Sequence, residues 1–119
     1  MPGRDEHLRV AGRFESFAKS IQNQPYNEWL VIVWFHIALH YVDAVLATKG
    51  HRQVAGHSDR WAKCELYPEL QPIASEFHQL YKDAKEARYD AGEYTLRDLE
   101  PIQRRYERIR ATLRGLLGL

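Results

Sequence analysis

The amino-acid sequence predicts a small all-α protein, an up-and-down antiparallel bundle of four to five helices. Apolar residues recur at spacings of three and four along most of the chain, and one long stretch is apolar on nearly every side. Short clusters of Gly, Pro, Asn and Asp separate these stretches. Because the 119-residue chain shows no internal repeat and no shift in composition, we expect one domain over residues 1–119.

The first predicted helix covers His7 to Ile21 and ends at Asn23-Gln24-Pro25. Its apolar residues are spaced so that they share one face of a helix. They are Val10, Ala11, Phe14, Phe17, Ala18 and Ile21. This face is expected to pack against the rest of the bundle.

The second predicted helix forms the centre of the bundle. We expect Asn27 to cap it and Thr48-Lys49-Gly50 to end it. Residues 29–46 are apolar on nearly all sides, so other helices must surround them. This stretch contains three ionisable side chains, those of His36, His40 and Asp43. Because ionisable groups are costly inside a lipid bilayer, they favour a buried core helix over a membrane span. The expected core comprises Val33, Ile37, Ala44 and Val45, with Phe14, Phe77, Leu80 and Ile109 around them.

Two helices are predicted in the middle of the chain. Ser58 is a candidate cap for a short helix that runs through Leu66. Pro72 suits the start of the next helix. The stripe on that helix consists of Ile73, Phe77, Leu80, Tyr81, Ala84 and then Arg88. Residues Asp90 to Tyr94, which include Gly92, form the following break.

The last predicted helix carries a heptad pattern. We prefer Asp98 over Thr95 as its cap, because Pro101 then falls in the first turn, where a missing N–H is tolerated. The heptad seam consists of Leu99, Ile102, Tyr106, Ile109, Leu113 and Leu116. This seam, together with the aromatic residues Trp29, Trp34, Phe35 and Trp61, predicts a homodimer with two-fold symmetry.

The overall composition limits the function classes. The formal net charge is only +1, which argues against a uniform basic surface for non-specific nucleic-acid binding, so any anion site must be local. A lone cysteine, Cys64, excludes an internal disulfide and fits a reducing compartment. No apolar stretch follows the charged residues at the N-terminus, so we expect no signal peptide and a cytoplasmic protein that does not enter a membrane.

One candidate site is a histidine pair within the second helix. His36 and His40 are one helical turn apart, and Asp43 follows on nearly the same face. Such a pair can bind a metal from one helix, with His57 or His78 as a third ligand. Core histidines that hydrogen-bond to neighbouring helices are the alternative, and we assign no metal and no cofactor.

A second candidate site is basic. Arg52 precedes His57 with four residues between them, and Arg60 follows three residues later. An arginine can hold a phosphodiester while a histidine transfers a proton, without a metal. Arg88-Tyr89 ends the fourth predicted helix, where a cation also stabilises the helix dipole.

The order of several short segments resembles the HEPN family, the higher-eukaryote and prokaryote nucleotide-binding helical bundles. The segments are Ala38-Leu39-His40-Tyr41-Val42-Asp43-Ala44-Val45-Leu46-Ala47, the His57-x-x-Arg60 step, Leu80-Tyr81 and Ala87-Arg88-Tyr89. The resemblance covers residues 28–114. It implies a helical bundle, commonly a homodimer, in the bacterial or archaeal cytoplasm.

The resemblance implies two functions for the basic residues. Many HEPN proteins are metal-independent endoribonucleases of toxin–antitoxin or defence systems that use an arginine, four to six residues and a histidine, a spacing that Arg52 and His57 fit. Other members bind nucleotide or RNA, or pair with an antitoxin or a nucleotidyltransferase-like partner, through features that resemble His57, Arg60, Arg88 and Tyr89. We expect a nucleotide- or RNA-associated binding or partner module, in which Arg60 and Arg88 bind phosphate. The alternatives are an endoribonuclease with Arg52 and His57 as its catalytic pair, and a metal-binding bundle.

Overall fold

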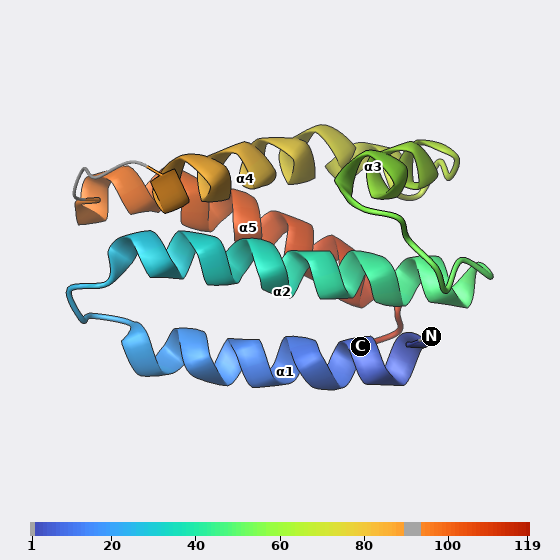
Figure 1. Cartoon of the computed structure of the whole chain (residues 1–119), viewed down its shortest axis with the longest axis horizontal. Coiled ribbons are helices and arrows are strands. Elements are labelled where there is room, and N and C mark those ends of the chain that lie inside the picture. Colours follow the sequence, from blue (N-terminus) through green and yellow to red (C-terminus); the bar gives the residue numbers. More distant parts are fainter. Residues whose placement is uncertain (1, 90–93) are drawn as a thin grey trace.

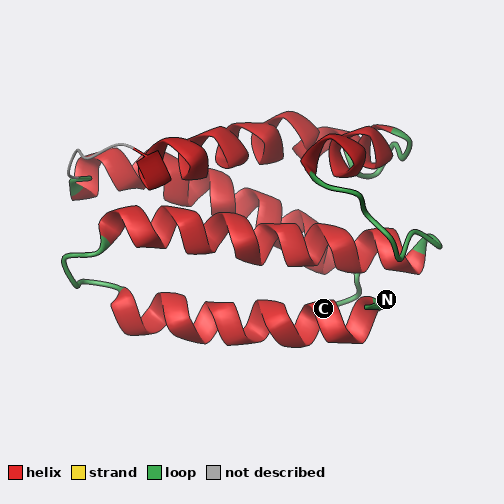
Figure 2. Ribbon diagram, viewed as in Figure 1, coloured by secondary structure: helices red, strands yellow, loops and turns green. Residues whose placement is uncertain are grey.

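The computed structural model describes residues 2–89 and 94–119, in which every regular element is a helix (Figures 1 and 2). The five helices are α1 (Arg4–Ile21), α2 (Asn27–Thr48), α3 (His57–Glu65), α4 (Gln71–Tyr89) and α5 (Leu96–Leu116). No strand occurs in these described ranges. The prediction of an all-α protein is therefore confirmed.

Helix α2 lies at the centre of the protein. It packs against α1, α4 and α5, and it touches α3 near its C-terminal end (Figure 1). Val33, Ile37, Ala44 and Val45 are buried as predicted, and so are Phe77, Leu80 and Ile109, whereas Phe14 is only partly buried. By length and composition α2 could also cross a membrane, and 72% of its most apolar window is buried inside the protein.

Helix α1 begins earlier than the apolar pattern predicts. The backbone N–H of Gly3 donates to the Glu6 carboxylate at 2.7 Å, which satisfies a group at the helix start and places the first turn at Arg4. The predicted apolar face is largely confirmed, since Ala11 and Ala18 are buried. Phe17 is the exception, with 48% of its surface exposed.

The caps of α2 and α3 differ from the prediction. Asn27 is the first residue of α2 and not its cap, and its side chain donates to the carbonyl of Tyr94 at 2.7 Å. Gly56 rather than Ser58 precedes α3 as its cap. Gly56 has a φ of +117°, a conformation that side-chain-bearing residues rarely adopt, and this turn sets His57 at the first position of α3.

The preference for Asp98 as the cap of α5 is wrong. Thr95 is the cap: its hydroxyl accepts from the Asp98 N–H at 3.2 Å, and the Thr95 N–H donates to the Asp98 carboxylate at 2.8 Å. Pro101 consequently lies inside the helix. Because Pro101 has no N–H, the carbonyl of Arg97, four residues earlier, lacks its usual helical hydrogen bond. Both residues are exposed, so water can donate to this carbonyl instead.

The heptad seam of α5 packs within the chain. Leu99, Ile102, Tyr106, Ile109 and Leu113 are buried, and the Tyr106 ring stacks on Trp34 of α2 with centroids 5.6 Å apart. Leu116, the last seam position, is 41% exposed. The seam is thus satisfied without a second copy. The predicted break after α4 lies mostly outside the described residues, at positions 90–93.

Candidate functional site

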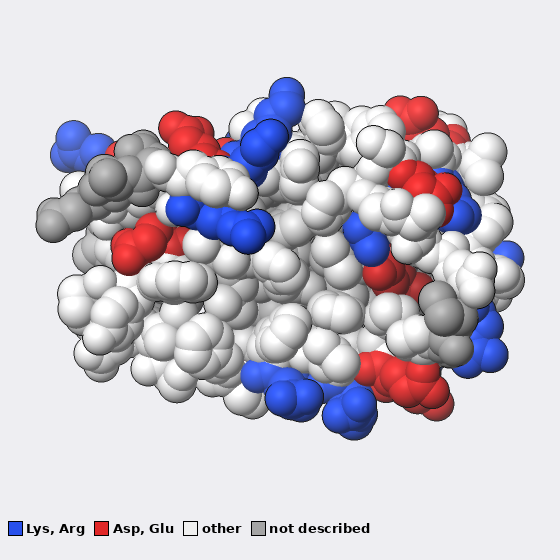
Figure 3. Space-filling view, viewed as in Figure 1, with Lys and Arg blue, Asp and Glu red and all other residues white. Residues whose placement is uncertain are grey.

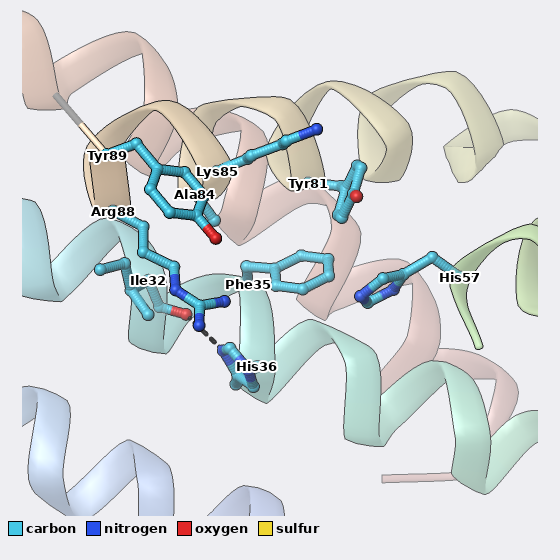
Figure 4. Close-up of a pocket in the computed structure, with 9 residues that line it drawn as sticks. All are labelled: Ile32, Phe35, His36, His57, Tyr81, Ala84, Lys85, Arg88 and Tyr89. Atoms are coloured by element: carbon cyan, nitrogen blue, oxygen red, sulfur yellow. Dashed lines mark hydrogen bonds between the residues drawn. The ribbon is translucent and has the colours of Figure 1, made fainter.

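A cavity of about 240 Å³ opens between α2 and α4, with α3 at one end (Figure 4). It is lined by Ile32, Phe35, His36, His57, Tyr81, Ala84, Lys85, Arg88 and Tyr89. We call it the cationic pocket. Helix α4 contributes residues at spacings of three and four, so that a single helix face forms one wall.

The pocket is basic and aromatic. Lys85 and Arg88 lie in the last two turns of α4, and none of the nine lining residues is acidic. The guanidinium of Arg88 extends toward His36 (Figure 4) and lies 5.5 Å from the centroid of the Tyr89 ring. Figure 3 shows this side of the protein as a largely uncharged central band, with basic and acidic side chains along its margins. An anion that enters the pocket would therefore meet two cations and no carboxylate.

His57 closes the pocket at the α3 end. Its ring lies 4.6 Å from the Tyr81 ring and 5.5 Å from the Phe35 ring, measured between centroids. Nη1 of Arg60 lies 3.2 Å from Nδ1 of His57. A guanidinium can only donate, so Nδ1 must accept and the ring proton resides on Nε2. Burial, and then the charge of Arg60, lower the pKa of His57, so a neutral ring with one N–H donor faces the pocket at neutral pH.

Arg60 is not in position to bind an anion directly. Its Nε and Nη2 donate to the two carboxylate oxygens of Asp43 at 2.7 and 3.0 Å, and its remaining Nη1 faces His57. Both side chains of the ion pair are 8% exposed. The predicted phosphate-binding role of Arg60 therefore does not fit its placement, and the geometry makes it a positioning residue for His57.

Arg52 lies apart from the pocket. It is exposed in the loop between α2 and α3, and its guanidinium lies against Gly3, where a Cβ atom would come within 2.8 Å of Nη2. The four basic residues predicted from the sequence are therefore only partly brought together: His57 and Arg88 share one cavity, Arg60 lies behind His57, and Arg52 is elsewhere. Within one chain, the predicted catalytic pair is not brought together.

The two histidines of α2 point to different neighbours. Nδ1 of His36 lies 2.9 Å from the Ile32 carbonyl oxygen, and the ring lines the cationic pocket. His40 instead faces α1, with its Nδ1 3.1 Å from Nδ1 of His7. Burial, followed by the nearby His7, lowers the pKa of His40 to about 4. Within residues 2–89 and 94–119 no three His, Cys, Asp or Glu side chains form a group that could hold a metal ion.

Lys85 and Phe35 line the pocket but were not among the site residues predicted from the sequence. Lys85 lies four residues after Tyr81 and three before Arg88, so the helical spacing of these residues already indicated a shared face. The sequence carried no such signal for Phe35, because in a helix that is apolar on all sides the pattern does not show which neighbouring helix a given side chain faces.

Comparisons with known proteins add no family assignment. No family model, no curated protein and no solved structure matches this chain. The resemblance to HEPN proteins thus stays an expectation from the sequence, and the chemistry of the cationic pocket is the evidence that bears on function.

Proposed function

We propose that this protein is a HEPN-like up-and-down bundle that binds the phosphate groups of nucleotides or RNA in the cationic pocket. The observation that carries the proposal is the convergence of Arg88, Lys85 and the N–H of His57 on one cavity without an acidic lining residue. Binding of a phosphorylated ligand, rather than catalysis, is the function that this geometry supports best.

Each basic group has a distinct part in the proposed binding. The planar guanidinium of Arg88 can donate two parallel hydrogen bonds to one phosphate, whereas the Lys85 ammonium acts as a point charge on a flexible stem. His57 adds a neutral donor, because Arg60 keeps its Nδ1 occupied as an acceptor. The negative end of the α4 dipole opposes an anion here, so the two cations must outweigh it.

The aromatic walls add a second kind of contact. Phe35, Tyr81 and Tyr89 line the same cavity as the cations. Aromatic faces beside cations are the combination with which proteins bind single-stranded nucleic acid, since bases stack on the rings while the cations contact the backbone. An acidic loop of a partner protein would use the cations but would have no need of these rings.

The endoribonuclease alternative has less support. It requires Arg52 beside His57, and the guanidinium of Arg52 lies against Gly3 instead. In addition, Nδ1 of His57 faces Arg60 and its Nε2 carries the proton, so the neutral ring can donate to a ligand but cannot accept a proton from it in this arrangement. RNA cleavage is included as an outcome in the test.

The test is binding of a fluorescein-labelled single-stranded oligoribonucleotide, followed by anisotropy in EDTA at low salt. We expect Arg88→Ala and Lys85→Ala each to weaken binding several-fold and to reduce its salt dependence, because each removes a phosphate contact. The matched control is Arg104→Ala, which removes an exposed arginine of α5 that pairs with Glu100 at 3.2 Å within its own helix. This control should bind like the wild type.

Equal binding by the wild type and Arg88→Ala would contradict the proposal. Gel analysis of the same mixtures tests cleavage. Cleavage by the wild type that His57→Ala abolishes without loss of binding would favour the endoribonuclease over the binding module.

We also propose that the protein is a homodimer. The α5 seam does not support this, and the proposal rests on the resemblance to HEPN proteins, with Phe17, 48% exposed, and Leu96, 73% exposed, among the apolar side chains available for a contact. Light scattering at micromolar concentration should return about twice the chain mass of 14.0 kDa. A mass near that of one chain would refute the dimer.

A further inference from the structure

A second cavity adjoins the cationic pocket. It has a volume of about 230 Å³ and lies between α3 and α4. It is lined by His57, Ser58, Trp61, Phe77, His78 and Tyr81, and we call it the aromatic pocket. His57 and Tyr81 line both cavities, with their ring centroids 4.6 Å apart, so this pair of rings forms the boundary between the two.

The chemistry of the aromatic pocket differs from that of its neighbour. It has no Lys, Arg, Asp or Glu among its six lining residues, and five of the six are aromatic rings. The Trp61 and His78 rings lie 4.3 Å apart, and both residues are partly exposed, so ring surface is accessible from solvent. The Ser58 hydroxyl and the histidine nitrogens add hydrogen-bonding groups at the edge. These features suit a neutral planar ring with polar edges.

We infer that the aromatic pocket is the subsite for the base of a nucleoside phosphate whose phosphate group lies in the cationic pocket. The inference rests on the proposed function and names the ligand class that the joined site takes. The volume of about 230 Å³ is smaller than the roughly 300 Å³ or more of pockets for drug-sized ligands. A cavity of this size suits a single ring system such as a nucleobase.

The spacing of the two subsites fits one nucleotide. Along α4, His78 lines the aromatic pocket and Lys85 the cationic pocket, and the step of seven residues between them corresponds to about 10 Å along the helix axis. A base beside His78 and a phosphate bound by the flexible Lys85 side chain are then separated by a distance that one nucleotide spans. The N–H of His57 lies at the boundary, within reach of the sugar–phosphate linkage.

The first test uses the wild-type protein and three probes: adenosine 5′-monophosphate, ribose 5-phosphate and adenosine. NMR titration of the ¹⁵N-labelled protein gives each dissociation constant, and the three tryptophan indole N–H signals report the location of the base. We expect adenosine 5′-monophosphate to bind roughly 5- to 100-fold more tightly than ribose 5-phosphate, the range expected for stacking of one base. Adenosine alone should shift the Trp61 indole signal.

The second test compares variants with the same probes. Trp61→Leu should reduce the affinity for adenosine 5′-monophosphate to near that for ribose 5-phosphate and leave ribose 5-phosphate binding unchanged. The matched control is Trp29→Leu, at an exposed tryptophan that lines neither cavity, and it should change neither affinity. Arg88→Ala should weaken both phosphorylated probes alike.

The outcomes separate this inference from the proposed function. Equal affinities of wild type for the two phosphorylated probes, both weakened by Arg88→Ala, would overturn the base subsite and leave the phosphate site standing. A base preference that survives Trp61→Leu would also overturn the subsite. If neither adenosine 5′-monophosphate nor ribose 5-phosphate binds, both the base subsite and the proposed phosphate site are overturned. The comparison of adenosine 5′-monophosphate with ribose 5-phosphate uses only the wild-type protein, so the inference can be tested even if a variant does not fold.

Discussion

Removal of one member of the buried Asp43–Arg60 ion pair should destabilise the protein far more than removal of both. Both side chains are 8% exposed, and two N–O contacts of 2.7 and 3.0 Å join them. Asp43→Ala leaves a guanidinium that cannot lose its proton in an apolar interior. The expected loss is about 3–5 kcal/mol of the free energy of unfolding. The double variant Asp43→Leu/Arg60→Met replaces the pair with apolar groups and should be near neutral or more stable.

Urea denaturation followed by far-UV circular dichroism measures these free energies. Asp43→Asn serves as a milder single variant, since domains of this size are stabilised by only about 5–15 kcal/mol and Asp43→Ala can approach that limit. The slope of the unfolding free energy against urea should stay constant across the series, which shows that the denatured state is comparable. If the single and double variants lose the same stability, the two residues are not coupled and the reasoning is refuted.

The same variants test the positioning of His57. Burial is the main cause of its lowered pKa, and the charge of Arg60 is the second. The double variant removes Arg60, which lowers the pKa of His57, together with Asp43, which raises it to a smaller extent, so the pKa should rise toward its ordinary value, as measured by NMR titration of the ring protons. An unchanged titration would contradict the larger effect of Arg60.

Three further predictions concern the fold. Ile37→Ala should reduce the unfolding free energy by about 2–5 kcal/mol, because Ile37 is fully buried at the centre of α2; an unchanged denaturation midpoint would contradict this. Folding lowers the pKa of His40 to about 4, so between about pH 6.5 and pH 4 the unfolded chain binds a proton at His40 more readily than the folded protein does. The unfolding free energy should therefore decrease by up to about 3 kcal/mol as the pH falls through this range. His40→Asn should flatten that pH dependence, and identical profiles for the two proteins would refute the assignment. Thr95→Ala should lower the unfolding free energy by about 1 kcal/mol through loss of the α5 cap, whereas Ser at the same position should retain it.

The sequence by itself determined the helices and the central place of α2. Apolar spacing is a local property of the chain, so the stripe of α5 could be assigned without knowledge of its neighbours. The all-apolar stretch of α2 requires burial on every side whatever the packing partners are. His57 and Arg88 were both candidate site residues because their order along the chain resembles that of HEPN proteins, but this order does not place them in one pocket.

Only the tertiary structure decided the partners of individual polar side chains. Asn27 looked like a cap, but its side chain binds the carbonyl of Tyr94, a residue far away in the sequence. Arg60 and Arg52 both looked like anion-binding residues, yet one is held by Asp43 of α2 and the other lies against Gly3. A long side chain at a given position can reach in several directions, and its direction depends on which helix packs beside it. Hydrogen bonds between groups distant in sequence therefore decided which of the predicted residues share a site.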